Sequence, residues 1–528
     1  MLYMKSMSFE FIGLDEESLL VQKKEFNEKL SNIPTAFTQH VFYTEDYIEA
    51  PGSLKFYRPL QTVSFIIDEQ FSNNNFSFFY FTNILFHFLA VTGFLFVLIK
   101  LNLNRHLAFL LALLFAVHPL LVQAIAWIPG RGDSMMTAFI LWSFYFLIRY
   151  SKELSIKIFS FHILLFSAAL FTKESAVMFF PLCFLWIFFL EGKNLSTKNK
   201  IVLIGTHAVI ILFWFIVRKS VTGEIKYGLS PGVLYYSFLE HFPLVLQYFQ
   251  KLFLPINLSV MSVVKDTHYG WVVLTLLLFG TGIYLTKKIP WKEISFGIFW
   301  YFLFLLPTLL FSYFEGMEHR SYLPVLGIIF SCAYLDPIIA LSKKTNRLLV
   351  IFGATIFIFA CITFNRISIF SSELSYWKNA FETSEHSAVV CRDYGVILTK
   401  IGDYENAEKA YLEGIKRDPK ETLIHYNLGV MYYRAGQFEE AKKNLIEELN
   451  INSSNFMIYH VLGVIYNKES RTEEAITMWE QAVSINPNFI ESYKELLSVY
   501  STKKDTINFE RCRIVLENRG MKIVKRTQ

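Results

Sequence analysis

FFYFTNILFHFLAVTGFLFVLIK, at residues 78–100, is the stretch that decides the fold class, because it holds no charged side chain before Lys100. A helix needs about 20 such residues to cross a ~30 Å hydrocarbon core. Over all 528 residues, 53% are hydrophobic and 18% are charged, whereas soluble domains carry about 25% charged residues. The chain is therefore predicted to be an integral membrane protein, with a lipid bilayer as the solvent for part of it.

Similar apolar segments recur along the next part of the chain, and we predict ten membrane-spanning helices. Several are near the shortest length that can span. They cover residues 78–101, 106–128, 132–150, 156–172, 175–190, 200–217, 270–286, 293–313, 321–340 and 346–364. A further apolar stretch, 233–253, is interrupted by Glu240, His241 and Pro243. We expect it to lie in the outer interface or to re-enter the bilayer; an eleventh span is the alternative.

The basic residues predict the orientation of these spans. Alternate linkers carry fourteen: Lys100, Arg105, Arg149, Lys152, Lys157, Lys193, Lys198, Lys200, Lys287, Lys288, Lys292, Lys343, Lys344 and Arg347. The opposite linkers carry seven: Arg131, Lys173, Arg218, Lys219, Lys226, Lys265 and Arg320. Because the richer side is normally cytoplasmic, the segment 1–77 and everything after Phe364 are expected on the extracytoplasmic face.

A 34-residue period begins at His386, with Gly395, Gly429 and Gly463 at equivalent positions. Small residues at this spacing let paired helices pack closely, which is typical of tetratricopeptide repeats. We predict repeats at 386–419, 420–453 and 454–487, with a degenerate fourth at 488–520. The fold class is thus all-α: a polytopic membrane bundle (78–366) after a first loop (1–77), then a junction helix (367–385) and an α-solenoid (386–520). Such a solenoid binds peptides or proteins and supplies no chemistry.

Composition excludes several function classes. A net charge of +5 is too small for a nucleic-acid surface on a chain of this length. The five cysteines, Cys183, Cys332, Cys361, Cys391 and Cys512, are scattered, which is unlike a disulfide framework or a zinc site. We predict no metal ligands and no certain cofactor, and metal dependence stays open. The first 20 residues hold acidic side chains and no apolar core, so they do not read as a cleavable signal peptide.

Polar clusters on the predicted outer face are candidate functional sites, since charges near apolar segments are costly and mark function by default. Each also has an ordinary structural explanation, such as a solvated surface, a turn or a local ion pair. The clusters contain Asp15, Glu16 and Glu17; Arg58; Arg131 and Asp133; Lys173 and Glu174; and Glu318, His319 and Arg320. Carboxylates suit a general base, and arginines grip phosphate through charge-assisted hydrogen bonds. Together they indicate transfer from a lipid-phosphate donor to an exposed hydroxyl.

These motifs resemble a known family. His118-Pro-Leu-Leu-Val-Gln-Ala-Ile-Ala-Trp-Ile-Pro-Gly-Arg131-Gly-Asp133 resembles the His-Pro, Ala-Trp-Ile and Gly-Arg-x-Asp segment of the transmembrane and tetratricopeptide repeat-containing (TMTC) O-mannosyltransferases and their bacterial relatives. Shorter motifs follow the same family pattern in order: Tyr57-Arg58-Pro59-Leu60, Lys173-Glu174, Glu318-His319-Arg320-Ser321-Tyr322-Leu323-Pro324, and Tyr376-Trp377 before the repeats. The resemblance covers nearly the whole chain.

The resemblance implies a GT-C fold, in which the first extracytoplasmic loop of a multi-span glycosyltransferase carries a catalytic acidic pair. The implied donor is a polyprenyl- or dolichyl-phosphate sugar, here with Asp15 as the base and Glu16 or Glu17 supporting it. On charge alone we nominate Arg58, Arg131 and Arg320 to hold the lipid phosphate, with Asp133, Lys173, Glu174, Glu318 and His319 beside them. The family opens with a membrane helix before the acidic pair, so we expect the natural start to lie upstream of Met1.

Two other functions compete with a transferase that moves a sugar, mannose being one candidate, to a protein or glycan hydroxyl. One is a non-catalytic membrane scaffold that displays the tetratricopeptide groove to an envelope partner. A transporter is weaker, because the charges gather at one face. The expected partners are the bilayer, the lipid-linked sugar and an acceptor protein or peptide in the groove, with no nucleic acid. Frequent Phe, Ile, Lys and Asn favour a bacterial inner membrane with periplasmic repeats; in a eukaryote the endoplasmic reticulum would take its place.

Overall fold

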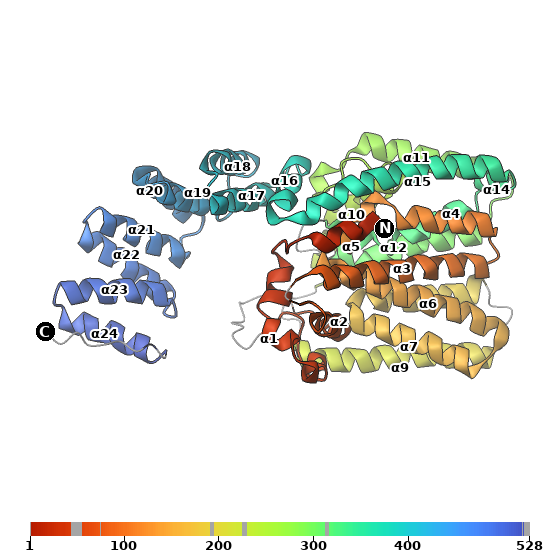
Figure 1. Ribbon diagram of the computed structural model, residues 1–528, viewed down its shortest axis with the longest axis horizontal. Coiled ribbons are helices and arrows are strands. Elements are labelled where there is room, and N and C mark those ends of the chain that lie inside the picture. Colours follow the sequence, from red (N-terminus) through yellow and green to blue (C-terminus); the bar gives the residue numbers. More distant parts are fainter. Residues whose placement is uncertain are drawn as a thin grey trace. The chain divides into compact units, whose positions relative to one another are not determined.

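The computed structural model describes residues 2–43, 55–73, 75–190, 195–223, 230–311, 316–519 and 521. Within these ranges, regular structure is helical apart from one isolated β-bridge between Ser262 and Gly316. The chain divides into two compact units, Met1–Ser384 and Glu385–Gln528. Figure 1 shows the helices of both units. An all-α chain with a membrane part and a repeat part agrees with the prediction from composition and period.

The first unit is built mainly from apolar helices that lie side by side (Figure 1). They are α3 (Ser77–Lys100), α4 (Arg105–Ala116), α6 (Arg131–Glu153), α7 (Ile156–Thr172), α8 (Phe179–Leu185), α9 (Thr197–Thr222), α10 (Pro231–Phe253), α11 (Tyr269–Tyr284), α12 (Trp291–Phe311), α13 (Val325–Ala333), α14 (Asp336–Ser342) and α15 (Thr345–Ile367). Among the described residues, four helices are long and apolar enough to cross a membrane, or up to six if each bent pair forms one span.

The difference from ten predicted spans has a physical reason. Helices α7 and α11 are apolar but shorter than 18 residues, and the segment 105–126 bends by 48° at His118-Pro119. Proline lacks the N–H that a continuous helix needs. Length and composition therefore identify four to six spans.

Glycine allows two of these helices to approach closely. A Cβ on Gly297 of α12 would lie 2.3 Å from the carbonyl oxygen of Gly327 on α13, and the reverse contact would be equally short. Small residues at helix contacts are the usual way to bring backbones together in membranes, where no hydrophobic effect drives association. Neither position can take a larger side chain without separating α12 from α13.

Helix α10 corresponds to the stretch predicted to lie at the outer interface. Its first half is open, with Tyr236 72% exposed, whereas Leu244 in its second half is 1% exposed. The side chain of Tyr301 on α12 donates a hydrogen bond to the Val245 carbonyl at 2.5 Å. This amphipathic burial suits a helix at a boundary, and its place relative to a bilayer stays a prediction.

The segments before α3 pack on one end of the bundle. A 3-10 segment, Leu2–Ser8, is followed by α1 (Lys24–Asn27) and α2 (Pro59–Glu69). Two hydrogen bonds tie the first residues to α3: the Ser77 hydroxyl donates to the Met7 carbonyl at 2.7 Å, and Tyr80 donates to the Glu10 carbonyl at 3.2 Å. The acidic motif at residue 15 is thereby anchored to the start of α3, beside the short helix α5 (Gln123–Ala126).

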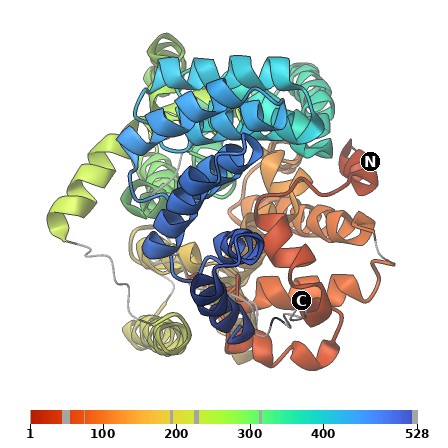
Figure 2. The same cartoon turned by 90° about the vertical axis from the view of Figure 1, so that its left-hand side faces the viewer.

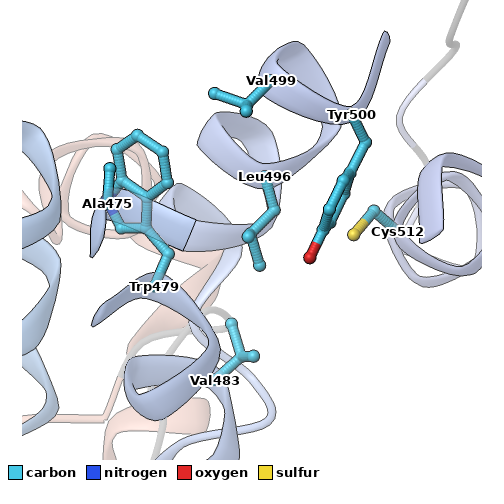
Figure 3. Packing of buried hydrophobic residues seen from close by; sticks show 7 residues of the cluster. All are labelled: Ala475, Trp479, Val483, Leu496, Val499, Tyr500 and Cys512. Atoms are coloured by element: carbon cyan, nitrogen blue, oxygen red, sulfur yellow. The ribbon is translucent and has the colours of Figure 1, made fainter. Parts of the chain in front are cut away.

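The second unit contains successive helical pairs, visible in Figure 2. They are α17 (Ala388–Ile401) with α18 (Tyr404–Arg417), α19 (Ile424–Arg434) with α20 (Phe438–Ile451), α21 (Phe456–Lys468) with α22 (Thr472–Ile485), and α23 (Ile490–Thr502) with α24 (Thr506–Glu517). The recurring glycines sit where the paired helices touch: a Cβ on Gly463 would lie 2.5 Å from the Trp479 indole nitrogen. Figure 3 shows Trp479, Leu496 and Cys512 within the hydrophobic core that joins the last two pairs.

Candidate functional site

The acidic motif sits on an unusual turn at the end of the bundle. Gly13 has φ +83° and Leu14 has φ +55°, and the latter is rare for a residue with a branched side chain. The Glu16 carboxylate stabilises this turn, because it accepts hydrogen bonds from the backbone N–H of Ile12 at 2.5 Å and of Ile128 at 3.3 Å. Backbone strain of this kind is characteristic of functional sites. The turn leaves the neighbouring side chain, Asp15, exposed.

The two carboxylates of the motif therefore differ. Glu16 is fully buried, and burial raises its pKa to about 8, although the two N–H groups act in the opposite direction. Asp15 keeps accessible surface, yet protein atoms surround it on most sides; this desolvation raises its pKa, while the nearby positive charge of Arg58 lowers it. A carboxyl with a raised pKa and an open face has the properties of a general base, whereas Glu16 has those of a support.

Arg58 is held beside this motif by a neighbouring motif from the sequence. Its Nε donates to Glu174 Oε2 at 3.0 Å, and the backbone N–H of Tyr57 donates to Glu174 Oε1 at 2.8 Å. Both side chains are partly exposed. Glu174 thus orients the segment that carries Arg58. The Arg58 guanidinium has further N–H groups besides the Nε–H that binds Glu174.

Lys173 and Asp133 form a second ion pair of the site. The Lys173 ammonium lies 2.7 Å from each Asp133 carboxylate oxygen, and His319 Nε2 lies 3.8 Å from Asp133 Oδ2. Burial lowers the pKa of Lys173, as do the charges of Arg58 and Arg320, while Asp133 raises it. Positive charges from three distant parts of the chain therefore act on one another at this place.

Tracing these residues in turn gives a ring of neighbours, in which Arg58 is joined to Asp15 and to Lys173 by electrostatic interaction and the other members by contacts. Trp127 packs on His319 with ring centroids 5.5 Å apart, and the next residue, Ile128, is the one that donates to Glu16. The ring runs through Asp15 and Glu16, Trp127 and Ile128, His319, Asp133, Lys173 and Arg58. We call it the site ring. Asp15, Glu16, Arg58, Asp133, Lys173, Glu174, His319 and Arg320 all belong to it or touch it, so the structure brings together most of the nominated residues.

Arg131 does not fit its nominated role as a phosphate ligand. It is 0% exposed and pairs with Asp68 at 2.5 Å. Its remaining N–H groups donate to Asn83 Oδ1, Ser64 Oγ and the Phe79 carbonyl at 2.7–2.9 Å. The Arg131 guanidinium joins α2, α3 and α6 instead, because a buried guanidinium needs a partner for every N–H.

Glu318 is also structural in this geometry. Its carboxylate is 0% exposed and accepts from the Lys251 ammonium at 2.8 Å, the Arg366 guanidinium at 2.6 Å and the Ser259 N–H at 2.9 Å. The side chain thus points to α10 and α15, whereas the next residue, His319, reaches the site ring. Sequence reasoning missed Lys251, Arg366 and Asp68 as partners because each lies far along the chain from the charge that it neutralises.

A metal-binding cluster is not formed by the part of the chain that the structure describes, since it has no group of three or more His, Cys, Asp or Glu side chains suitable for an ion. The site ring offers cations, an exposed carboxylate and buried ring nitrogens. These groups suit an anionic, hydroxyl-bearing molecule.

Comparison with known proteins bears on what that molecule is. Residues 67–217 match the model of the dolichyl-phosphate-mannose-protein mannosyltransferase family, and residues 395–436 and 458–489 match tetratricopeptide repeat models. The protein O-mannosyl-transferase F38B6.6 of Caenorhabditis elegans is 22% identical over 448 residues, which is 79% of this chain. The chain is a distant homologue of the TMTC O-mannosyltransferases. Human protein O-mannosyl-transferase TMTC2 is 32% identical over a shorter region, 27% of this chain.

The chain spans only part of the length of these relatives: 61% of the worm protein and 16% of human TMTC2. Among solved structures, the crystal structure of MamA is similar over 28% of this chain and 91% of MamA, with 18% identity and a TM-score of 0.26.

Proposed function

We propose that this chain is a membrane-embedded glycosyltransferase. It moves a sugar, with mannose favoured by the names of its relatives, from a polyprenyl- or dolichyl-phosphate donor to a hydroxyl of a protein or glycan acceptor. The family match over residues 67–217 supports the reaction class. The observation that carries the proposal is the exposed Asp15 carboxylate, held on a strained turn within electrostatic reach of Arg58.

In the proposed reaction Asp15 is the base. Its carboxylate accepts the proton of the acceptor hydroxyl as that oxygen attacks the anomeric carbon of the sugar. The bond between the anomeric carbon and the phosphate oxygen breaks, and the lipid phosphate leaves with the electron pair. Protonated Asp15 then returns its proton to solvent. Attack opposite the leaving phosphate inverts the anomeric centre, and general-base catalysis of this type contributes typically 10²–10⁴-fold to rate.

The leaving phosphate gains negative charge, and we assign its stabilisation to Arg58, Lys173 and Arg320. These three cations influence one another electrostatically, and preorganised cations aimed at a developing charge are usually the largest catalytic contribution. Asp133 and Glu174 position Lys173 and Arg58 through their ion pairs. Arg131 and Glu318 are assigned to the framework.

The membrane arrangement belongs to the same proposal. Length and composition identify four to six spans among the described residues; we propose ten crossings of GT-C type, with the site ring at the extracytoplasmic end, because each predicted span contains helical structure in the first unit. Ion pairs at the opposite end include Lys100 with Glu153 at 3.8 Å, on the side that the positive-inside rule assigns to the cytoplasm. We propose a bacterial inner membrane, and the domain limits 1–77, 78–366, 367–385 and 386–520.

The repeats are proposed to bind the acceptor. Matches to tetratricopeptide models at 395–436 and 458–489 support a protein-binding role, since repeat stacks of this kind present extended concave surfaces to partners. The alternative, a non-catalytic scaffold, would need the same repeats but would have no use for an exposed carboxylate beside three cations.

The deciding experiment replaces Asp15→Asn in the full-length protein and supplies isolated membranes with labelled polyprenyl-phosphate mannose and candidate acceptor proteins. Transfer should fall at least 100-fold, while expression and membrane insertion stay at the wild-type level. Glu10→Gln is the matched control, because Glu10 is an exposed carboxylate only five positions away. Full activity in Asp15→Asn would remove Asp15 from the mechanism, and absence of transfer by the wild type with every donor would favour the scaffold.

A further inference from the structure

Two buried nitrogen atoms of the site ring lack a hydrogen-bond partner among the described residues. They are Nε1 of Trp127 and Nδ1 of His319. The two residues are 3% and 7% exposed, and the centroids of their rings lie 5.5 Å apart. A buried polar group without a partner is destabilising, and native proteins leave few of them. Two unpartnered nitrogens in adjacent rings point to a ligand that forms the missing hydrogen bonds.

Their position identifies where that ligand would lie. Trp127 precedes Ile128, whose N–H donates to Glu16 beside the exposed Asp15. On the other side, His319 approaches Asp133, which binds Lys173. The two rings therefore connect, through these neighbours, the segment of the candidate base with the Asp133–Lys173 ion pair. Under the proposed function, the sugar of a lipid-phosphate donor would bind against these rings.

The chemistry of the pair selects hydroxyl groups over phosphate. Trp Nε1 only donates. His319 has its Nε2 towards Asp133, so a proton on Nε2 would interact favourably with that carboxylate and leave Nδ1 as an acceptor. Burial opposes a second proton on the ring, as do the surrounding charges of Lys173, Arg320 and Arg58, and Asp133 is the counter-charge that faces it. A hydroxyl both donates and accepts, whereas an ionised phosphate only accepts.

We propose that Trp127 and His319 form a hydroxyl-recognition pair for the donor sugar, separate from the cations that hold its phosphate. The inference rests on the proposed function, because it places the same lipid-linked donor in the site ring. It adds a physical basis for distinguishing a sugar-loaded lipid from the bare lipid phosphate that remains after transfer: only the loaded lipid satisfies both nitrogens.

Equilibrium binding to the purified full-length protein tests this pair. Dissociation constants are measured for polyprenyl-phosphate mannose and for polyprenyl phosphate of the same chain length. The wild type should prefer the mannosylated lipid. In Trp127→Phe, and in His319→Phe, which keeps a ring against Trp127, that preference should fall about 5- to 10-fold, the usual effect of one lost hydrogen bond. Affinity for bare polyprenyl phosphate should stay within about twofold in Trp127→Phe.

Trp214→Phe is the matched control. Trp214 is also buried, at 5% exposure, and its Nε1 is also unpartnered, but it lies on α9 and outside the site ring. Trp214→Phe should prefer the mannosylated lipid over the bare lipid phosphate as strongly as the wild type does. Equal loss of affinity for both lipids in Trp127→Phe and His319→Phe, or an unchanged preference in either, would overturn the pair. A wild type that binds both lipids equally would also overturn it while leaving the phosphate site standing; a wild type that binds neither would defeat the proposed function itself.

Discussion

Replacing Asp68→Asn tests whether Arg131 is a framework residue or a phosphate ligand. Arg131 is fully buried, and Asp68 is its only anionic partner among the described residues, at 2.5 Å. The other acceptors of Arg131 are the neutral Asn83, Ser64 and Phe79 oxygens. Removing one partner of a buried ion pair costs about 3–5 kcal/mol, because the other charge is left uncompensated. Asparagine would also turn an N–H group towards a guanidinium that has only donors.

The assay is denaturant unfolding of the full-length protein in detergent, followed by far-ultraviolet circular dichroism. Asp68→Asn should lower the free energy of unfolding by about 3–5 kcal/mol. The double variant with Arg131→Met removes both charges, so it should be less destabilised than the sum of the two single variants. Glu153→Gln, at an exposed ion pair with Lys100 and Arg149, should leave the unfolding curve unchanged. A loss below about 1 kcal/mol for Asp68→Asn, the range of exposed pairs, would refute the reasoning and restore Arg131 as a candidate ligand.

Three further predictions follow from particular side chains. Burial raises the pKa of Glu16 to about 8 from an ordinary 4.5. The contribution of Glu16 to folding stability is therefore complete below about pH 4.5 and is lost as the pH rises towards 8. Protection of the Ile12 and Ile128 amides from hydrogen exchange should fall over this pH range, and Glu16→Gln should abolish that pH dependence. Because the charge of Arg58 lowers the pKa of Asp15, Arg58→Gln should move the acid limb of the transfer rate to higher pH; an unmoved limb would separate Arg58 from the base. Gly463→Ala places a Cβ 2.5 Å from the Trp479 indole and should destabilise the repeats by about 1–3 kcal/mol in denaturant unfolding, whereas Gly205→Ala, with open space around it, should not destabilise the chain.

The sequence predicts this fold well where local pattern governs structure. Long uncharged stretches such as residues 78–100 have one stable solution in a bilayer, and helix α3 occupies them. The 34-residue period similarly specifies paired helices, because Gly395, Gly429 and Gly463 each face a side chain of the following helix at under 3 Å from a hypothetical Cβ. Composition does not decide whether the shorter helices span the membrane, since a 16-residue apolar helix such as α11 fits either a protein core or a membrane.

The site is only partly readable from the sequence. Motif order places Asp15, Arg58, Lys173 and His319 together, but charge alone does not say which cation is buried. From the sequence, Arg131 and Glu318 are candidate ligands. In the structure each forms a buried ion pair, with Asp68 and Arg366 respectively, so both are framework residues. No local sequence pattern predicts that Trp127 Nε1 is unpartnered, because this depends on whether any distant segment places a hydrogen-bond acceptor near it. Such properties emerge from long-range packing.

The residues around Asp15 come from segments that leave the ribosome at very different times. The turn at Gly13 and Leu14 leaves the ribosome first, yet its supports, at Ile128 and then at His319, emerge only after several helices have entered the bilayer. A nascent chain therefore carries the Asp15 carboxylate long before the residues that surround it in the folded protein have been made. Prematurely terminated products that lack His319 should therefore insert into membranes without the contacts of His319 to Trp127 and Asp133.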